Sequence, residues 1–347
     1  MASDWLDSKE IRRFVMDCTG CVDFSAPQRV QSLWSGYGEV RRLQLTYGQE
    51  DGSLPKSVVA KWIDPPEAPV HPRGWGSDMS HQRKLESYRV ESNWYQDYAG
   101  RCTDQCVVPI CLGQSNFDDA TLLLLSDLDS QYPERYSRLN KAGVTNCLHW
   151  LAHFHARFFD VAPNGLWPTG TYWQLQTRPD EFNVMADGEL KQAASWLHEE
   201  LESCTYITLV HGDAKVANFC FETSGNGVAA VDFQYIGAGV GIRDVVYFLG
   251  SCLDESELAD NESEYLDIYF IELDEALQHY QPAVQASRVC DCWRDLYAVA
   301  WTDFYRFLAG WMPDHPKTHT YTRKLADQAL SEFSNSGVHS RVLSPKT

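Results

Sequence analysis

Two carboxylates and one amide follow short apolar runs in the middle of the chain, with a spacing that could support chemistry on a phosphate group. The first run leads into His211-Gly-Asp213, Asn218 comes five residues after Asp213, and a second run ends on Asp232. One carboxylate so placed can accept a hydroxyl proton, while an amide and a second carboxylate can hold Mg²⁺. The alternative is a strand–turn–strand unit in which these residues only cap turns.

This block resembles the signature of the aminoglycoside phosphotransferase and choline kinase group, in which His-Gly-Asp stands where protein kinases have His-Arg-Asp. The Asp-Phe-Gln ending at 232–234 resembles the ecdysteroid kinase-like branch. The resemblance implies an α+β, bilobal protein-kinase-like fold, with a five-stranded antiparallel small lobe and a mostly helical large lobe. It also implies ATP and Mg²⁺ as cofactors, Asp213 as the base, and Asn218 and Asp232 as metal ligands. Lys215 matches a lysine that some kinases place on the γ-phosphate.

A glycine-rich connection separates two predicted strands at 30–34 and 40–47. Its residues Ser35, Gly36 and Gly38 are candidates for a loop that covers phosphates, because glycines let backbone amides approach phosphate oxygens closely. An ordinary glycine-containing hairpin turn is the alternative. The apolar strand that follows is the observation that favours the nucleotide loop.

That third strand, predicted at 57–63, contains a single lysine among apolar residues. An unpaired buried cation is costly, so Lys61 needs a negative partner. Val-Ala-Lys also resembles the strand-three lysine pattern of kinases, which pairs with a glutamate on the next helix and with ATP phosphates. Within the helix predicted from about Asp78 to Ala99, Glu91 is the favoured partner and Glu86 the competitor.

Two further strands, predicted at 107–111 and 121–125, would complete the small-lobe sheet. The residues after them, from Ser126 to Asp129, resemble the kinase hinge, whose backbone meets adenine, and Asp127 is the candidate there. The lobes are therefore predicted to divide after residue 126. Residues 1–126 would form a small nucleotide-binding lobe, and residues 127–347 a large catalytic and substrate-binding lobe.

The predicted large lobe contains helices at about 138–159, 172–202, 242–249 and 317–333, and an aromatic stripe at 293–307. Most such stripes are core. The alternative is a cage for an ammonium group, because acidic residues interleave with the rings. The candidate cage residues are Trp293, Trp301 and Tyr305.

Asp244 either braces the catalytic loop or is a simple first-turn acid. His149, His153 and His155 are interpreted as packing or surface histidines, since no His-Glu-x-x-His pattern is present.

Composition limits the possible partners of the chain. A net charge of −19 argues against binding to nucleic acid or to anionic membranes and suits a cationic or neutral substrate. No apolar run approaches the roughly 20 residues that cross a bilayer. The N-terminal residues lack the pattern of a signal peptide, and eleven scattered cysteines suggest reduced thiols. These features predict a soluble, cytoplasmic protein.

Taken together, the residues predict an ATP-dependent kinase that phosphorylates a hydroxyl of a small acceptor, with cationic amino alcohols or aminoglycoside-like molecules as candidates. A second hypothesis is a catalytically inactive nucleotide-binding regulator. A protein kinase is disfavoured, because only a short glycine-rich segment separates Asp232 from the next predicted helix and leaves no room for a peptide-binding activation loop.

Overall fold

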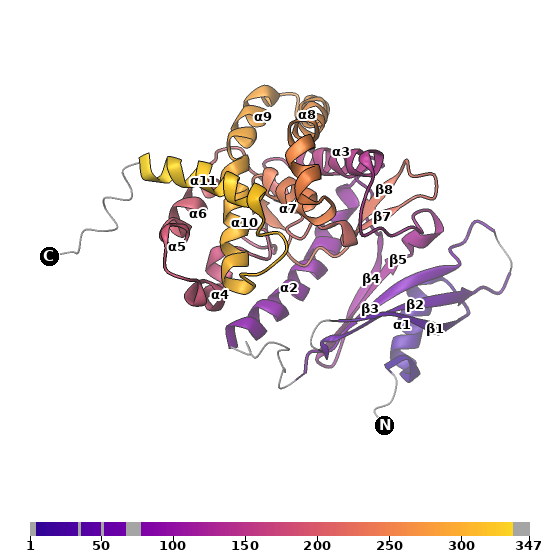
Figure 1. Ribbon diagram of the computed structural model, residues 1–347. Helices are drawn as coiled ribbons and strands as arrows, with labels where there is room; N and C mark the ends of the chain where they lie inside the picture. The colour runs from indigo at the N-terminus through magenta and orange to yellow at the C-terminus, as the bar shows by residue number, and fades with distance from the viewer. Residues whose placement is uncertain (1–4, 34–35, 50–51, 67–77, 336–347) are drawn as a thin grey trace. The chain divides into compact units, whose positions relative to one another are not determined.

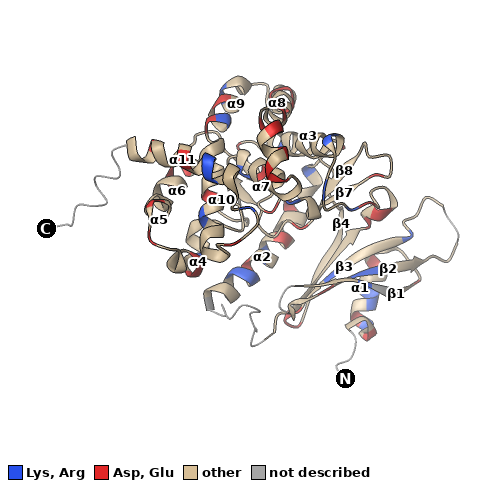
Figure 2. Cartoon of the chain, in the orientation of Figure 1, with Lys and Arg blue, Asp and Glu red and all other residues tan. Residues whose placement is uncertain are grey.

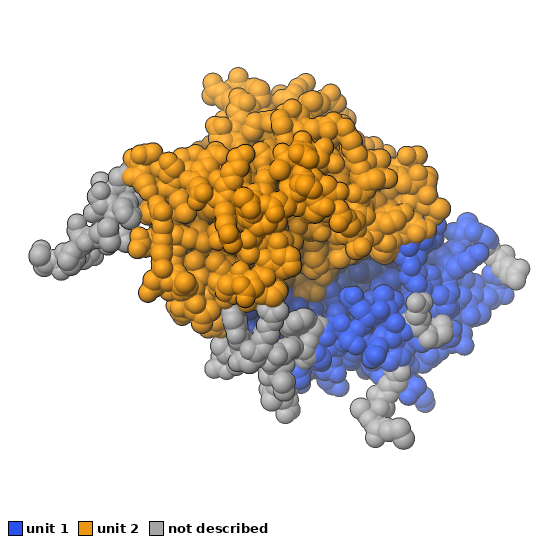
Figure 3. Space-filling view, viewed as in Figure 1, with its two compact units in different colours: residues 1–101, 108–133 blue, residues 102–107, 134–347 orange. Residues whose placement is uncertain are grey.

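The computed structural model describes residues 5–33, 36–49, 52–66 and 78–335 (Figure 1). Contacts between Cα atoms divide the chain into two compact units (Figure 3). The first unit comprises residues 1–101 and 108–133, and the second comprises residues 102–107 and 134–347. The division along the chain thus falls after Pro133, C-terminal to the boundary predicted after Ser126.

The first unit is built on a five-stranded antiparallel sheet, as the sequence predicted, and its strand order is β1-β2-β3-β5-β4. The first strand lies earlier in the chain than the predicted 30–34. The predicted strand at 107–111 is wrong. Pro109 cannot donate a hydrogen bond to a neighbouring strand. Val107 belongs to the second unit, where its carbonyl accepts a hydrogen bond from the Ala230 amide. The next strand of the sheet therefore begins only at Cys111. The strands are β1 (Asp23–Ser32), β2 (Gly38–Thr46), β3 (Ser57–Ile63), β4 (Cys111–Phe117) and β5 (Ala120–Ser126).

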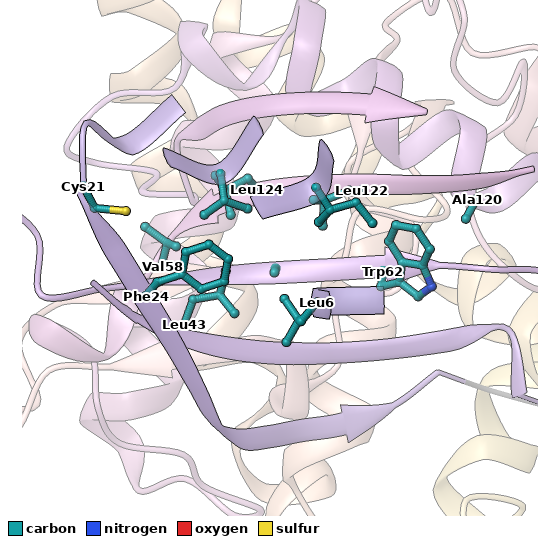
Figure 4. Packing of buried hydrophobic residues seen from close by; sticks show 12 residues of the cluster. Leu6, Cys21, Phe24, Leu43, Val58, Trp62, Ala120, Leu122 and Leu124 are labelled. Atoms are coloured by element: carbon teal, nitrogen blue, oxygen red, sulfur yellow. The ribbon is translucent and has the colours of Figure 1, made fainter. Parts of the chain in front are cut away.

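One face of the sheet packs against helix α1 (Lys9–Thr19). Ser8 starts this helix by accepting a hydrogen bond from the Ile11 amide, and Gly20 ends it in the left-handed conformation. Figure 4 shows the core on this face, where apolar side chains from four strands converge. Because side chains alternate along a strand, Ala60 and Trp62 of β3 belong to this core and Lys61 faces the other way.

The other face carries a smaller apolar cluster, to which Tyr88 of helix α2 (Asp78–Asp97) contributes. Tyr37, Val40 and Ile63 are its partners from the β1–β2 connection and the strands. Helix α2 therefore lies on the side of the sheet toward which Lys61 points. This placement is the one that a lysine–glutamate pair between β3 and the following helix requires.

The second unit is mostly helical and holds two short antiparallel ladders, β6 (Thr208–Val210) with β9 (Gly237–Gly239) and β7 (Phe219–Phe221) with β8 (Val228–Ala230). Its helices include α3 (Lys141–Arg157), α7 (Ile242–Cys252), α8 (Glu255–Tyr280), α9 (Ala286–Asp295), α10 (Tyr297–Trp311) and α11 (Thr320–Asn335). Helix α8 begins with a capping box made by Asp254 and Glu257, and acidic residues recur along it (Figure 2).

Two helical predictions for the second unit are wrong in extent. The segment 172–202 is not one helix but a 3₁₀ turn (Leu175–Thr177) followed by α4 (Pro179–Val184), α5 (Glu189–Gln192) and α6 (Ala194–Glu202). Pro179 can only start a helix and Gly188 weakens one, which explains the breaks. The aromatic stripe is divided between α9 and α10 at Leu296. Among the described residues, no helix is long and apolar enough to cross a membrane.

Candidate active site

The candidate base lies in the loop that follows β6. Asp213 is buried, with 7% of its surface exposed, and its carboxylate accepts a hydrogen bond of 2.8 Å from Lys215 Nζ. The side-chain amide of Asn218 donates to the Asp213 carbonyl at 2.8 Å and to its Oδ2 at 3.1 Å. The spacing of Asp213, Lys215 and Asn218 in the sequence therefore becomes a single hydrogen-bonded cluster.

Electrostatics in this cluster favour a basic carboxylate. Burial raises the pKa of Asp213 and the charge of Asp232 raises it further, although Lys215 and His211 act in the opposite direction. Burial lowers the pKa of Lys215, but the negative charges of Asp213 and Asp232 outweigh this, so its pKa is raised. A carboxylate with a raised pKa accepts a proton more readily than an ordinary aspartate does.

Asp232 follows β8 in a strained backbone conformation, with φ of 70°. Its Oδ1 accepts a 2.7 Å hydrogen bond from Gln234 Nε2, and the amide of the preceding residue, Val231, donates to the Asn218 carbonyl at 2.9 Å. The amide nitrogen of Asn218 is engaged with Asp213, which leaves Oδ1 of Asn218 as the side-chain atom that can accept a cation. The backbone bond from Val231 to Asn218 puts Asn218 and Asp232 on neighbouring segments, and both side chains offer oxygen donors of the kind that Mg²⁺ prefers.

The loop that contains Asp213 is held by a buried carboxylate on α7. Asp244 accepts hydrogen bonds from the backbone amides of His211 at 2.6 Å and Gly212 at 2.9 Å. His155 of α3 lies 3.1 Å from the same carboxylate through Nε2, and its Nδ1 contacts the Tyr269 hydroxyl at 2.8 Å. Of the two interpretations of Asp244, bracing of the loop is therefore confirmed. His155 is a positioning residue, which the sequence did not reveal.

The turn at His211-Gly-Asp213 depends on glycine and on the histidine ring. Gly212 has φ of +79°, and a Cβ at this position would lie 2.0 Å from the Tyr235 carbonyl oxygen. His211 Nε2 donates to the Val231 carbonyl at 3.1 Å, while its Nδ1 accepts from the Asp213 amide at 3.3 Å. The ring thereby links the candidate base to the segment that follows β8 and contains Asp232.

A cavity of about 630 Å³ adjoins the catalytic loop within the second unit. Lys215 and Tyr247 belong to its wall. Burial and the nearby Asp213 carboxylate raise the pKa of the Tyr247 hydroxyl. Lys317, which precedes α11, is part of the same wall. Neither Tyr247 nor Lys317 carries a local sequence signal, since each reaches the site from a distant element. The lining residues are Arg135, Tyr136, Ser137, Lys215, Val216, Ala217, Tyr247, Ser251 and Lys317.

In the first unit, Lys61 and Glu91 form a buried ion pair. Lys61 Nζ lies 2.8 Å from Oε1 and 2.6 Å from Oε2 of Glu91, and the two residues are 5% and 2% exposed. Glu86, the competing candidate, pairs instead with Arg89 on the surface of α2. The structure thus identifies Glu91 as the partner of Lys61.

The other candidates of the first unit have structural partners. Gly38 has φ of +129°, and a Cβ there would lie 2.0 Å from the Trp62 carbonyl, so close strand pairing alone requires a glycine. Gly36 also has a positive φ, of 77°, whereas Ser35 lies outside the described residues. The carboxylate of Asp127 accepts from Arg42 at 2.7 Å and from Ser57 at 2.6 Å, which ties β2 and β3 to the segment after β5.

The aromatic cage is contradicted for two of its three residues. Trp293 and Trp301 are 0% and 2% exposed, and their indole N–H groups donate to the Tyr206 carbonyl and to Thr322 Oγ1. Trp293 packs in a cluster with His155 and Phe159, and Trp301 in another with Tyr297 and Tyr321. The alternative interpretation of these two rings as core fits their burial. Tyr305 is half-buried on α10.

Comparisons with known proteins agree with the fold. Residues 173–281, which include the 209–234 block, match the model of the ecdysteroid kinase-like family. The chain is similar to a choline kinase from Cryptosporidium parvum Iowa II, with 9% identity, a TM-score of 0.51, and coverage of 97% of this chain and 98% of that chain. No curated protein matches the chain in sequence.

Two further solved structures are similar at lower TM-scores. An amicoumacin kinase in complex with AMP-PNP, Ca²⁺ and Ami has 12% identity, a TM-score of 0.48, and coverage of 94% and 93%. A microcompartment-associated aminopropanol kinase has 14% identity, a TM-score of 0.44, and coverage of 93% and 94%. The choline kinase similarity confirms the predicted kinase-like α+β fold, and the family match supports the resemblance read from the central block.

We predict that Asp244→Asn destabilises the protein. An amide has one acceptor oxygen, so at least one of the buried N–H groups that now bind Asp244 loses its partner. Leaving a buried donor unpaired costs about 1–3 kcal/mol of the free energy of unfolding. Urea denaturation measures the loss, and the exposed Asp291→Asn is the matched control. Equal stability of the two variants would contradict the bracing role.

Proposed function

We propose that this protein is an ATP-dependent kinase that transfers the γ-phosphate of ATP to a hydroxyl group of a small molecule. The observation that carries the proposal is the cluster of the buried Asp213 and Asn218 with the half-buried Lys215, beside Asp232, in which the pKa of Asp213 is raised. A cap for a turn does not need two carboxylates, a lysine and an amide in one partly buried site. The kinase-like fold and the family match are consistent with this reaction.

In the proposed reaction Asp213 takes the proton of the acceptor hydroxyl. The hydroxyl oxygen forms a bond to the γ-phosphorus, the bond from that phosphorus to the β–γ bridging oxygen breaks, and ADP leaves with the electron pair. Lys215 would then stabilise negative charge on the transferred group. Mg²⁺ neutralises phosphate charge when it is bound, and Asn218 Oδ1 with the Asp232 carboxylate would hold it.

The nucleotide roles in the first unit follow from the same proposal. Lys61, held by Glu91, would bind the α- and β-phosphates, since a lysine fixed by a carboxylate presents its ammonium group in one direction. The turn at Gly36 and Gly38 would cover the phosphates, and the backbone at Asp127 would meet the adenine. The side chain of Asp127 is occupied by Arg42 and Ser57, so a contact to adenine would come from the backbone alone.

The inactive-regulator hypothesis and the protein-kinase hypothesis are both less well supported. A regulator that only binds nucleotide has no use for a base with a raised pKa. An assay of ATP turnover with metabolite mixtures distinguishes such a regulator from an active small-molecule kinase. A protein kinase needs a long segment after Asp232. Here β9 begins at Gly237 and α7 at Ile242, so only a short segment separates Asp232 from the next strand and helix.

We predict that Asp213→Asn separates catalysis from binding. The amide keeps the size of the side chain but cannot accept the hydroxyl proton, and removal of a general base costs about 10² to 10⁴ in kcat. The Kd for ATP, measured by calorimetry, should change by less than about tenfold. The rate is measured with an acceptor found by metabolite screening, and Asp291→Asn is the control. Full retention of kcat in Asp213→Asn would disprove the proposed mechanism.

We also predict that Asp232→Ala abolishes the magnesium-dependent part of ATP binding. The remaining ligand, Asn218, is neutral and does not offset the charge of the cation and the phosphates as a carboxylate does. Thermal unfolding with ATP, in the presence and absence of Mg²⁺, measures this part directly. Asp291→Ala should keep the wild-type Mg²⁺ effect. If Asp232→Ala keeps it too, the metal is held by other residues.

A further inference from the structure

The cavity beside the catalytic loop has a local charge opposite to that of the whole chain. The chain carries 48 acidic and 29 basic residues, yet the described residues that line the cavity include three cations, Arg135, Lys215 and Lys317, and no carboxylate. Lys215 is paired with Asp213. The net charge of −19 led us to expect a cationic or neutral acceptor, and the cavity wall does not match that expectation.

Lys317 is half-buried and differs from three arginines that are also buried or half-buried. Arg178, Arg243 and Arg306 each form an ion pair with a carboxylate. In the part of the chain that the structure describes, no carboxylate forms an ion pair with Lys317. Its ammonium group lies instead 5.0 Å from the centre of the Tyr247 ring and 5.5 Å from that of Phe304. Burial and the charge of Lys215 lower its pKa to about 8, despite the opposing effects of Cys252 and Asp213.

The backbone of Lys317 is anchored by neighbouring polar groups. Thr322 Oγ1 donates to its carbonyl at 2.7 Å, and its amide donates to His315 Nδ1 at 3.1 Å. The buried Trp301 indole in turn donates to Thr322 Oγ1 at 3.0 Å. A lysine fixed in this way, half-buried and unpaired, is a favourable place for an anion, because a negative ligand offsets the cost of burying the charge.

From these contacts we infer that the acceptor alcohol carries a negatively charged group, a carboxylate or a phosphate, which binds Lys317 while its hydroxyl approaches Asp213. This inference rests on the proposed function for the identity of the reacting hydroxyl. Tyr247 connects the two ends of the subsite, because its ring contacts Lys317 and its hydroxyl is close to Asp213. Arg135, at the cavity wall, adds positive charge for the same group.

A matched sugar series tests the inference without nucleotide. Glucosamine, glucose, glucuronate and glucose 6-phosphate share a ring and differ in charge, and the two acids distinguish a carboxylate from a phosphate. We expect binding, measured by calorimetry, for at least one acid and about tenfold weaker or no binding for glucose and glucosamine. Lys317→Met should weaken the binding of that acid about tenfold, Lys317→Arg should retain it, and the exposed Lys324→Met should leave it unchanged.

The inference is overturned if neither acid binds, if glucosamine binds as tightly as the acids, or if Lys317→Met behaves like Lys324→Met. The last outcome would place a bound acid elsewhere, for example at the candidate nucleotide residues. Because binding is measured without ATP, it does not depend on turnover. Turnover of neutral or cationic alcohols alone would overturn this inference and leave the kinase proposal intact. Lys317-dependent acid binding by a protein that phosphorylates no alcohol would support an anion site at Lys317 and overturn the kinase proposal, and with it the assignment of the bound acid as the acceptor.

A separate observation concerns three side chains between α3 and α8. His149 and His153 lie one turn apart on α3, and Glu272 comes from α8. Their potential ligand atoms all lie within 4.8 Å of one another. Glu272 Oε2 is 2.9 Å from His149 Nδ1 and 3.8 Å from His153 Nε2. Two ligand atoms of a tetrahedral Zn²⁺ site lie roughly 3.3 Å apart, given bonds of about 2.0–2.1 Å.

The remaining ring nitrogens have partners of their own. His149 Nε2 contacts Gln105 Oε1 at 2.8 Å, and His153 Nδ1 contacts the Tyr280 hydroxyl at 3.2 Å. Metal-binding histidines are commonly oriented by such a bond at the second nitrogen. We propose that His149, His153 and Glu272 bind a divalent transition metal such as Zn²⁺.

Zinc titration of chelator-treated protein tests this site. We expect one equivalent of Zn²⁺ to bind in a way that requires Glu272. Its binding should raise Tm, because the metal would link α3 to α8. His153→Ala and Glu272→Gln should each remove that equivalent, whereas His198→Ala should keep it. The eleven cysteines are competing ligands for Zn²⁺. Zn²⁺ bound by cysteines would stay bound in His153→Ala and Glu272→Gln, which distinguishes it from Zn²⁺ at the proposed site. Absence of Zn²⁺ binding, or unchanged binding in His153→Ala, would overturn the site.

Discussion

The buried carboxylate of Asp244 is the interaction on which the candidate active site depends. It accepts from two consecutive backbone amides, those of His211 and Gly212, and it contacts His155. These amides follow β6 in a turn that no regular ladder can satisfy, so without a carboxylate they would be buried and unpaired. Because α7 and α3 supply the partners, the position of Asp213 depends on helix packing as much as on the loop itself.

Charge in this protein is arranged locally. Most buried cations lie against a carboxylate, as Lys61 does with Glu91, and the acidic excess is visible along exposed elements such as α8. The cavity beside Asp213 departs from both patterns. Exposed charges are screened over about 10 Å at ordinary ionic strength, so the total charge of the chain says little about one half-buried pocket. The side chains of that wall determine which ligand it favours.

The histidines of α3 show how partners decide the role of a residue. His149, His153 and His155 share one helix and all looked like packing or surface residues in the sequence. His155 is buried between Asp244 and Tyr269, whereas His149 and His153 face Glu272. Two residues along a helix rotate a side chain by about 200°, which separates the two environments. The difference in their surroundings therefore comes from α7 and α8.

The sequence by itself determined the residues that lie close along the chain or share a strong local pattern. The five-stranded sheet and the lysine–glutamate pair followed from strand alternation and the resemblance to kinases, and spacing placed Asp213, Lys215 and Asn218 in one loop. The hydrogen bonds that join these three residues came from the structure. The breaks in 172–202 and the burial of Trp293 and Trp301 needed the tertiary structure, because helical periodicity does not distinguish a core ring from a ligand-binding ring. Lys317 needed it as well. It reaches the wall that Lys215 lines from about a hundred residues away, and only packing of the second unit brings the two together.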